Sequence, residues 1–280
     1  MSVVSTVKRS SDLASLLSDK INLSESMQIL AASYKNAKPF PHVVIDDLFP
    51  ETLLDDLVRE TPPIDDDFWV HHDNDHEEKY GLRSAVELGP IGFQLTAFLH
   101  SASFLYFLSE LTGIWQLLPD PYLQGAGYSL IPHGAKFDVH CDRNVAYETG
   151  LRRRLALIIY LNKDWRHEYG GQLELWSQDG TRCEAVVEPV FNRTIVFAVD
   201  EGCYHGVPSP INTPFRGSRK SFLLYFHTTE TAGGTVVPHT SIWSPAFNAK
   251  RKAGFRGLVR DLTPPLLLRS FRKFRPPKVA

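Results

Sequence analysis

The sequence has no uninterrupted run of about eighteen or more apolar residues, the length that a membrane-spanning helix needs. Its first residues, MSVVSTVKRSSDLASLL, also lack the apolar stretch of a secretory signal. We therefore expect neither a membrane span nor export by that route.

Cysteine is scarce, with three residues in a chain of 280. The three, Cys141, Cys183 and Cys203, are too few and too odd in number to form a disulfide-stabilised scaffold. A reducing compartment is the simpler interpretation, and we predict a cytoplasmic protein.

Internal repeats and low-complexity tracts are also missing. With 43% hydrophobic and 22% charged residues, the composition is that of an ordinary globular protein, which excludes a mainly disordered, collagen-like or coiled-coil chain. A chain of this length is long enough for one sizeable core.

The charge is divided unevenly along the chain. Residues 248–280 hold ten Lys or Arg and one acidic residue, so this segment carries a charge of +9 against −11 for the rest. Apolar and basic residues alternate in it, and its prolines allow only short helical pieces. We expect peripheral contact with the inner face of an anionic membrane, with docking on the protein's own acidic body as an equal alternative. Because the body is acidic, no nucleic-acid binding is expected.

In the first part of the chain, the residue pattern predicts mainly helices, with a few strands between them. Apolar residues four apart within 10–34 indicate one or two short amphipathic helices. The segment FPHVVIDDLF, from Phe40, predicts a strand, and PETLLDDLVRE after it predicts a helix. Residues 62–90 are polar and predict a long surface loop with one strand at most, and residues 91–113 predict a further helix.

From Tyr122 onward the pattern changes to short β-type runs separated by Gly, Asp-Gly and Pro turn signals. The runs are YLQGAGYSLI, LALIIYL, GQLELW, EAVVE, TIVFAV and SFLLYF. Such turns favour antiparallel hairpins, as in a sandwich, barrel or jelly roll. We predict a mainly β (α+β) protein with a helical segment over 1–39, a β domain over 40–232 and a basic C-terminal tail over 233–280.

The candidate metal ligands are His140, Asp142 and His205. Residues two apart in a strand point to the same face, so His140 and Asp142 can present a nitrogen and an oxygen to one point. His205, after TIVFAV, supplies a distant imidazole. Two imidazoles and a carboxylate on one face of an octahedral ion suit a non-haem Fe(II) oxygenase. The alternative is a strand-end histidine without a metal, since H-x-D is short and the chain has eleven histidines.

The surrounding residues resemble a known family. From Gly127 to Phe226, the segments GYSLIPHGAKFDVHCDRN, RRRLALIIYLNKDWRHEYGGQLELW, VVEPVFNRTIVFAVDEGCYHGVPSP and SRKSFLLYF resemble, in order, the 2-oxoglutarate/Fe(II)-dependent dioxygenase superfamily, and within it the prolyl 4-hydroxylase-like branch. PFPHVVIDDLFP is similar to the segment with which the family's domain usually starts, so the likeness extends over residues 40–230. The resemblance implies a cupin-like double-stranded β-helix, with the N-terminal helices packed on it and His140, Asp142 and His205 binding iron.

The resemblance also implies a site for 2-oxoglutarate. It assigns the far carboxylate of this co-substrate to Arg219, whose guanidinium can hold a carboxylate through two parallel hydrogen bonds. Arg216, in the turn PFRG, is the rival. Tyr160 matches a family position whose phenol bonds the same carboxylate, although a core tyrosine is the alternative, and Tyr128 is a candidate for a similar contact.

Arg143 and Asn144 directly follow Asp142 and are candidates for substrate contact, a solvated turn being the alternative. The implied reaction uses Fe(II), 2-oxoglutarate and O2 to hydroxylate a C–H bond, with succinate and CO2 as products. Whether ascorbate is required is left open. The implied substrate is a peptidyl proline, an amino acid, or another small molecule or glycan.

Two other functions compete with this interpretation. One is a non-catalytic jelly-roll binding module, which would be free to lose any of the ligands. The other is a cupin-type metal enzyme that does not use 2-oxoglutarate, and such an enzyme would have no use for Arg219.

Overall fold

The computed structural model describes Leu17 and residues 23–214, 217–229 and 237–247. Residues 10–16 and 18–22 of the expected N-terminal helices lie outside this part, as does Arg216. The basic segment 248–280, with its expected membrane contact, lies outside it as well.

The described strands form two antiparallel sheets. The larger sheet has seven strands in the order β1-β9-β6-β11-β4-β3-β2, and the smaller has five in the order β12-β5-β10-β7-β8. The strands of the larger sheet are β1 (His42–Asp46), β9 (Arg193–Ala198), β6 (Arg152–Tyr160), β11 (Arg219–Thr228), β4 (Gly127–Ile131), β3 (Glu78–Leu82) and β2 (Trp69–Asp73). Those of the smaller sheet are β12 (Ile242–Trp243), β5 (Phe137–Cys141), β10 (His205–Val207), β7 (Leu173–Trp176) and β8 (Cys183–Val187).

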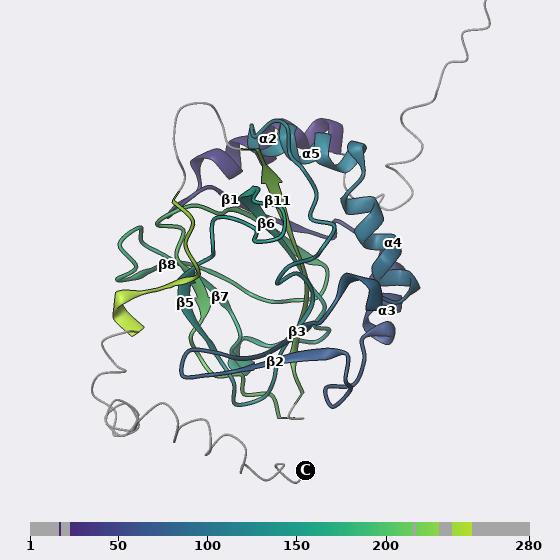
Figure 1. Cartoon of the computed structure of the whole chain (residues 1–280), viewed down its shortest axis with the longest axis vertical. Helices are drawn as coiled ribbons and strands as arrows, with labels where there is room; N and C mark the ends of the chain where they lie inside the picture. The colour runs from purple at the N-terminus through teal and green to yellow at the C-terminus, as the bar shows by residue number, and fades with distance from the viewer. Residues whose placement is uncertain (1–16, 18–22, 215–216, 230–236, 248–280) are drawn as a thin grey trace, which may run out of the picture.

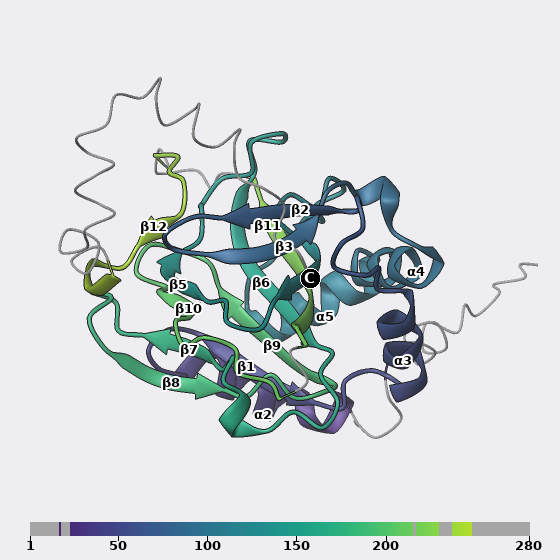
Figure 2. The same cartoon turned by 90° about the horizontal axis from the view of Figure 1, so that it is seen from below.

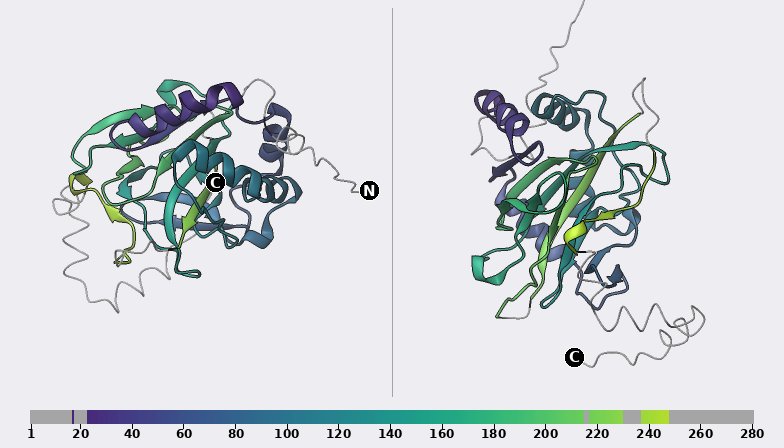
Figure 3. Two further views of the ribbon diagram at one scale, coloured as in Figure 1. Left: turned by 90° about the horizontal axis from the view of Figure 1, so that it is seen from above. Right: turned by 90° about the vertical axis from the view of Figure 1, so that its left-hand side faces the viewer.

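Helices gather along the top and one side of the molecule in Figure 1. They are α2 (Leu23–Asn36), α3 (Glu51–Glu60), α4 (Pro90–Leu99) and α5 (Ala102–Thr112), with short 3-10 turns at Ala85–Glu87 and His167–Tyr169. Helix α2 packs against α5 and β1, and α3 packs against α4. Figure 2 shows α3 and α4 at the end of the molecule opposite β7 and β8, and Figure 3 gives two further views of the same arrangement.

Strand β11 shows how the larger sheet separates two environments. Because side chains alternate along a strand, one face of β11 carries Arg219 and Tyr225, and the other carries Phe222 and Phe226. Phe226 lies 6.4 Å from the ring of Phe104 on α5, so the second face packs on the helices. The first face meets the smaller sheet, and the candidate site lies between the two sheets.

Two sequence predictions in the first part of the chain were wrong in detail. Residues 62–90 contain two strands, β2 and β3, paired with Trp69 opposite Leu82. The sequence shows no alternation of apolar and polar residues in β2, because this strand is largely exposed and its residues are mostly polar. The helix expected over 91–113 is two helices, since Ser101 starts a new one by accepting a hydrogen bond from Phe104 N.

No single helix in the described part of the chain has both the length and the apolar character to cross a membrane. Helices α4 and α5 meet at a bend of 54°. Only when the two are counted as one segment are they long and apolar enough to span a membrane.

Candidate metal centre and co-substrate site

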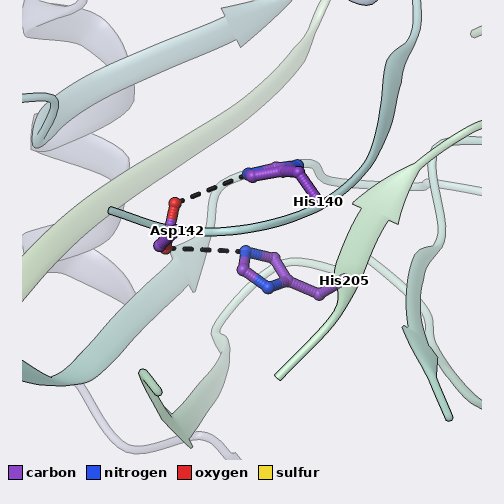
Figure 4. Close-up of side chains that lie close together, drawn as sticks. All are labelled: His140, Asp142 and His205. Carbon is purple, nitrogen blue, oxygen red and sulfur yellow. Dashed lines mark ion pairs between the residues drawn. The ribbon is translucent and has the colours of Figure 1, made fainter. Parts of the chain in front are cut away.

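Neighbouring strands of the smaller sheet bring His140, Asp142 and His205 together. His140 lies near the end of β5, Asp142 directly follows that strand, and His205 begins β10. Strands β5 and β10 are antiparallel, with His205 directly opposite His140. The three side chains converge on one point in Figure 4, although 62 residues separate Asp142 from His205 in sequence order.

The ligand atoms of the three side chains face one another at short range. The Nε2 atom of His140 lies 3.5 Å from Asp142 Oδ1, and that of His205 lies 3.6 Å from Asp142 Oδ2. One ligand atom from each residue falls within 4.8 Å of the others. All three residues are at least nine-tenths buried. Within the described ranges, this is the one group of three or more such side chains that could hold a metal ion.

Backbone carbonyls set which nitrogen of each imidazole faces Asp142. The Nδ1 atom of His140 bonds the carbonyl oxygen of Asp138 at 2.9 Å, and that of His205 bonds the carbonyl oxygen of Cys203 at 3.0 Å. Since a carbonyl oxygen only accepts, each Nδ1 carries a proton, and Nε2 is the ring nitrogen that faces Asp142. Burial lowers the pKa of His205 to about 4, against the opposing effect of Asp142, so this ring is neutral at pH 7.

The carboxylate of Asp142 is ionised and held in place. Burial alone would raise its pKa, but the neighbouring imidazoles and the Arg153 guanidinium together hold the pKa of this carboxyl well below its usual value. The hydroxyl of Tyr225 donates to Asp142 Oδ2 at 3.0 Å. Arg153 stacks on the Tyr225 ring at 3.8 Å from the centroid. Two imidazole nitrogens and a carboxylate therefore face one point, and this donor set fits Fe(II).

The guanidinium of Arg219 lies in the same inter-sheet space, at the far end of the β11 face that carries Tyr225. Arg219 is 4% exposed, and its Nε donates to the carbonyl oxygen of Gly171 at 2.7 Å. Its guanidinium carbon lies 4.9 Å from the centroid of the Tyr160 ring. Burial lowers the pKa of Arg219, but an arginine stays charged because its ordinary value is so high.

Tyr160 adds an unsatisfied hydroxyl to this pocket. Its side chain is fully buried, and among the described residues its hydroxyl makes no hydrogen bond within ordinary distance and angle limits. Burial raises the pKa of Tyr160, so the phenol is a neutral donor. A buried cation beside a free buried donor is what a carboxylate ligand would satisfy. The residues present thus fit the far carboxylate of 2-oxoglutarate.

The expected co-substrate contact of Tyr128 is wrong, because Tyr128 lies on the other face of the larger sheet. In the pairing of β4 with β11, Tyr128 is opposite Phe222 and Ile131 is opposite Arg219. The Tyr128 hydroxyl donates to Glu60 Oε1 on α3 at 2.9 Å. Strand β4 therefore offers an apolar side chain, that of Ile131, on the face of Arg219.

The expected substrate contact of Asn144 is also corrected. Its side-chain nitrogen donates to the carbonyl oxygen of Val237 at 2.9 Å, and its side-chain oxygen accepts from His239 N at 3.0 Å. Both ends of the amide are used within the protein, and Asn144 is 3% exposed. Arg143 stacks on the exposed ring of Tyr147 at 4.2 Å and is partly exposed, so its substrate contact stays a prediction.

Sequence reasoning missed Tyr225, although a signal was present. Tyr225 follows Arg219 by six residues in one strand, so the period of two places both on the same face. The carbonyl groups that orient the histidines left no signal, because any residue type supplies a carbonyl oxygen.

Comparison with known proteins agrees with this site. Residues 123–227 match the family model of the 2OG-Fe(II) oxygenase superfamily, and this range contains the three candidate ligands and Arg219. The chain is 28% identical over 225 residues to a prolyl 3,4-dihydroxylase, OGFOD1, of Ostreococcus tauri. That match covers 71% of this chain and spans 40% of the length of the relative.

Two solved structures share the fold. A prolyl-4-hydroxylase of Pseudomonas putida matches with a TM-score of 0.50 at 20% identity, covering 72% of this chain and 100% of that one. A prolyl hydroxylase of Trichoplax adhaerens, solved with a peptide fragment of a hypoxia inducible factor degradation domain, matches with a TM-score of 0.50 at 16% identity. It covers 73% of this chain and 91% of that one.

The core of this chain has the fold of a double-stranded β-helix, and its residues 123–227 are similar to the 2OG-Fe(II) oxygenase superfamily. The relatives named above are prolyl hydroxylases, which confirms the resemblance noted in the sequence.

Proposed function

We propose that this chain is an Fe(II)- and 2-oxoglutarate-dependent hydroxylase. In the balanced reaction, 2-oxoglutarate, O2 and a substrate R–H give succinate, CO2 and R–OH. One oxygen atom enters succinate and the other enters the product. The observation that carries the proposal is the convergence of two imidazoles and one carboxylate at a buried point. A buried guanidinium, that of Arg219, lies on the face of the larger sheet that meets this point.

Each residue of the proposed site has a separate task. His140, Asp142 and His205 would hold the iron, which supplies oxygen activation when bound. Arg219 and Tyr160 would hold the far carboxylate of 2-oxoglutarate and fix its orientation. The two sheets bury these groups away from bulk water, which strengthens charge-assisted hydrogen bonds to the co-substrate.

Succinate formation tests this proposal. The purified chain is loaded with Fe(II) without oxygen, given 2-oxoglutarate, and then exposed to air while succinate is measured. We expect succinate from the wild-type chain and none above background from His205→Ala. The matched control is His167→Ala, because His167 is an exposed histidine bonded to Glu188 at the surface. If His205→Ala formed as much succinate as the wild type, the proposed iron site would be wrong.

We further propose that the substrate is a prolyl residue in a peptide. The support is that the curated relative is named a prolyl 3,4-dihydroxylase and that the two structural relatives are named prolyl hydroxylases. The test is mass spectrometry of proline-containing peptides after turnover, beside the same peptides with alanine in place of proline. We expect one added oxygen atom on the proline peptides alone. Turnover restricted to free amino acids or glycans would contradict this choice of substrate.

A further inference from the structure

Residues 237–247, which we name the C-terminal strap, pair with the end of β5 on the side away from β10. Within the strap, β12 pairs with β5 so that Ile242 is opposite Cys141 and Trp243 is opposite the candidate ligand His140. Ser244 N donates to the carbonyl oxygen of Val139 at 2.8 Å. Residues 76–78 bond the start of β5 on the same side, so without the strap the end of β5 that carries His140 would lack hydrogen bonds along that side.

Both ends of the described strap are fastened to the protein. At its start, the amide of Asn144 bonds the backbone at Val237 and at His239, as described above. Further along, the buried hydroxyl of Ser244 donates to the carbonyl oxygen of Gly180 at 2.5 Å. Asn144 lies two residues after Asp142, so the strap is attached immediately beyond one candidate ligand and directly beside another.

The side chain of Trp243 packs against the ring of His140. Their ring centroids are 5.4 Å apart, as expected for residues directly opposite in an antiparallel pair. Trp243 also stacks on His76, with centroids 4.3 Å apart and planes 13° from parallel. The ring of Phe137, three residues before His140, has its centroid 4.2 Å from that of His140. The imidazole of His140 therefore has an aromatic neighbour on its own strand and another on the strap.

His76 connects Trp243 to the backbone group that orients His140. The His76 Nδ1 atom lies 3.2 Å from Asp138 Oδ2, and this carboxylate is also paired with Lys136. The carbonyl oxygen of the same Asp138 accepts the hydrogen bond from His140 Nδ1. The strap thus contacts His140 directly through Trp243 and indirectly through His76 and Asp138.

We propose that the C-terminal strap is part of the metal centre, with Trp243 and Asn144 as positioning residues for His140 and Asp142. The inference rests on the proposed function only in requiring that the triad binds a divalent metal. Groups that orient a metal's ligands tune its affinity, and their loss commonly weakens metal binding by about 10- to 100-fold. Neither residue touches the substrate or the metal in this account.

The test measures Co(II) binding by isothermal titration calorimetry without oxygen, together with the visible spectrum of the bound Co(II). We expect Trp243→Ala and Asn144→Ala each to weaken Co(II) binding by about tenfold or more and to change the spectrum. Trp243→Phe, which keeps an aromatic ring, should restore most of the affinity. The matched control is Ile242→Ala, in the same strand, because the Ile242 side chain is 40% exposed and lies on the face opposite Trp243.

The outcomes separate a positioning role from a structural one. A lowered melting temperature of the metal-free variants with unchanged Co(II) affinity and spectrum would overturn the inference. Equal losses from Ile242→Ala and Trp243→Ala would also overturn it, since strap docking alone would then be responsible. Tight Co(II) binding without succinate formation would contradict the proposed function and leave the role of the strap intact. Failure of the wild-type chain to bind Co(II) would overturn both.

Discussion

Tyr225 has the clearest single-residue role among the groups that the sequence did not single out. Its hydroxyl donates to the carboxylate of Asp142, and Arg153 stacks on its ring. Burial raises the pKa of Tyr225, and the neighbouring charge of Asp142 raises it further, so the phenol keeps its proton at every working pH. A neutral donor on a ligand carboxylate fixes the orientation of that carboxylate without removing its charge.

We expect Tyr225→Phe to weaken divalent-metal binding by about tenfold while leaving the fold intact, because only the hydroxyl is removed. Metal titration of the variant, with circular dichroism as the check on folding, measures this effect. Tyr106→Phe is the matched control, since Tyr106 lies on α5, away from the candidate ligands, and its side chain is exposed. Wild-type metal affinity in Tyr225→Phe would show that Asp142 needs no such partner.

At the scale of elements, the close approach of β5 and β10 sets the spacing of the two histidines. Gly206 directly follows His205, and a Cβ atom placed there would lie 2.7 Å from Val139 Cα and 2.9 Å from Val139 N. Both of these are backbone atoms, so no side-chain rotation can relieve the overlap. Glycine at 206 is therefore required by the space between the strands.

We expect Gly206→Ala to displace β10 from β5, to lower metal affinity at least tenfold, and to destabilise the protein by about 1–3 kcal/mol. Chemical denaturation and metal titration measure the two effects. Gly81→Ala serves as the control, because the nearest atom to a Cβ there is a histidine side-chain nitrogen at 3.9 Å. If Gly206→Ala matched Gly81→Ala in both measurements, the spacing of these strands would not determine the site.

The sequence predicted the elements whose pattern is local. The apolar runs of β6, β9 and β11 mark buried strands, and His140 and Asp142 share a face because of the period of two. The face of Tyr128 could not be predicted, since it depends on the register of β4 against β11. Asn144 was misassigned because its partners, Val237 and His239, lie more than ninety residues away. Strand β12 has only two residues, too few for a pattern.

At the scale of the whole molecule, the two sheets bring together groups that serve different ligands. The smaller sheet carries the candidate metal ligands, and the larger sheet carries Arg219 and Tyr160. Two hydrogen bonds connect β11 of the larger sheet with residues next to strands of the smaller one: Tyr225 bonds Asp142, directly after β5, and Arg219 bonds Gly171, shortly before β7. We therefore expect the metal and the co-substrate to bind to one continuous site between the two sheets.

The most direct test of this claim is calorimetric titration of 2-oxoglutarate into the Co(II)-loaded chain without oxygen. We predict that binding requires the metal and that Arg219→Ala weakens it by about 100-fold, because a buried carboxylate loses its cation. Arg152→Ala, in which a surface arginine paired with Asp200 is removed, should bind like the wild type. Equal affinity of Arg219→Ala and the wild type, or binding that does not depend on the metal, would contradict the account.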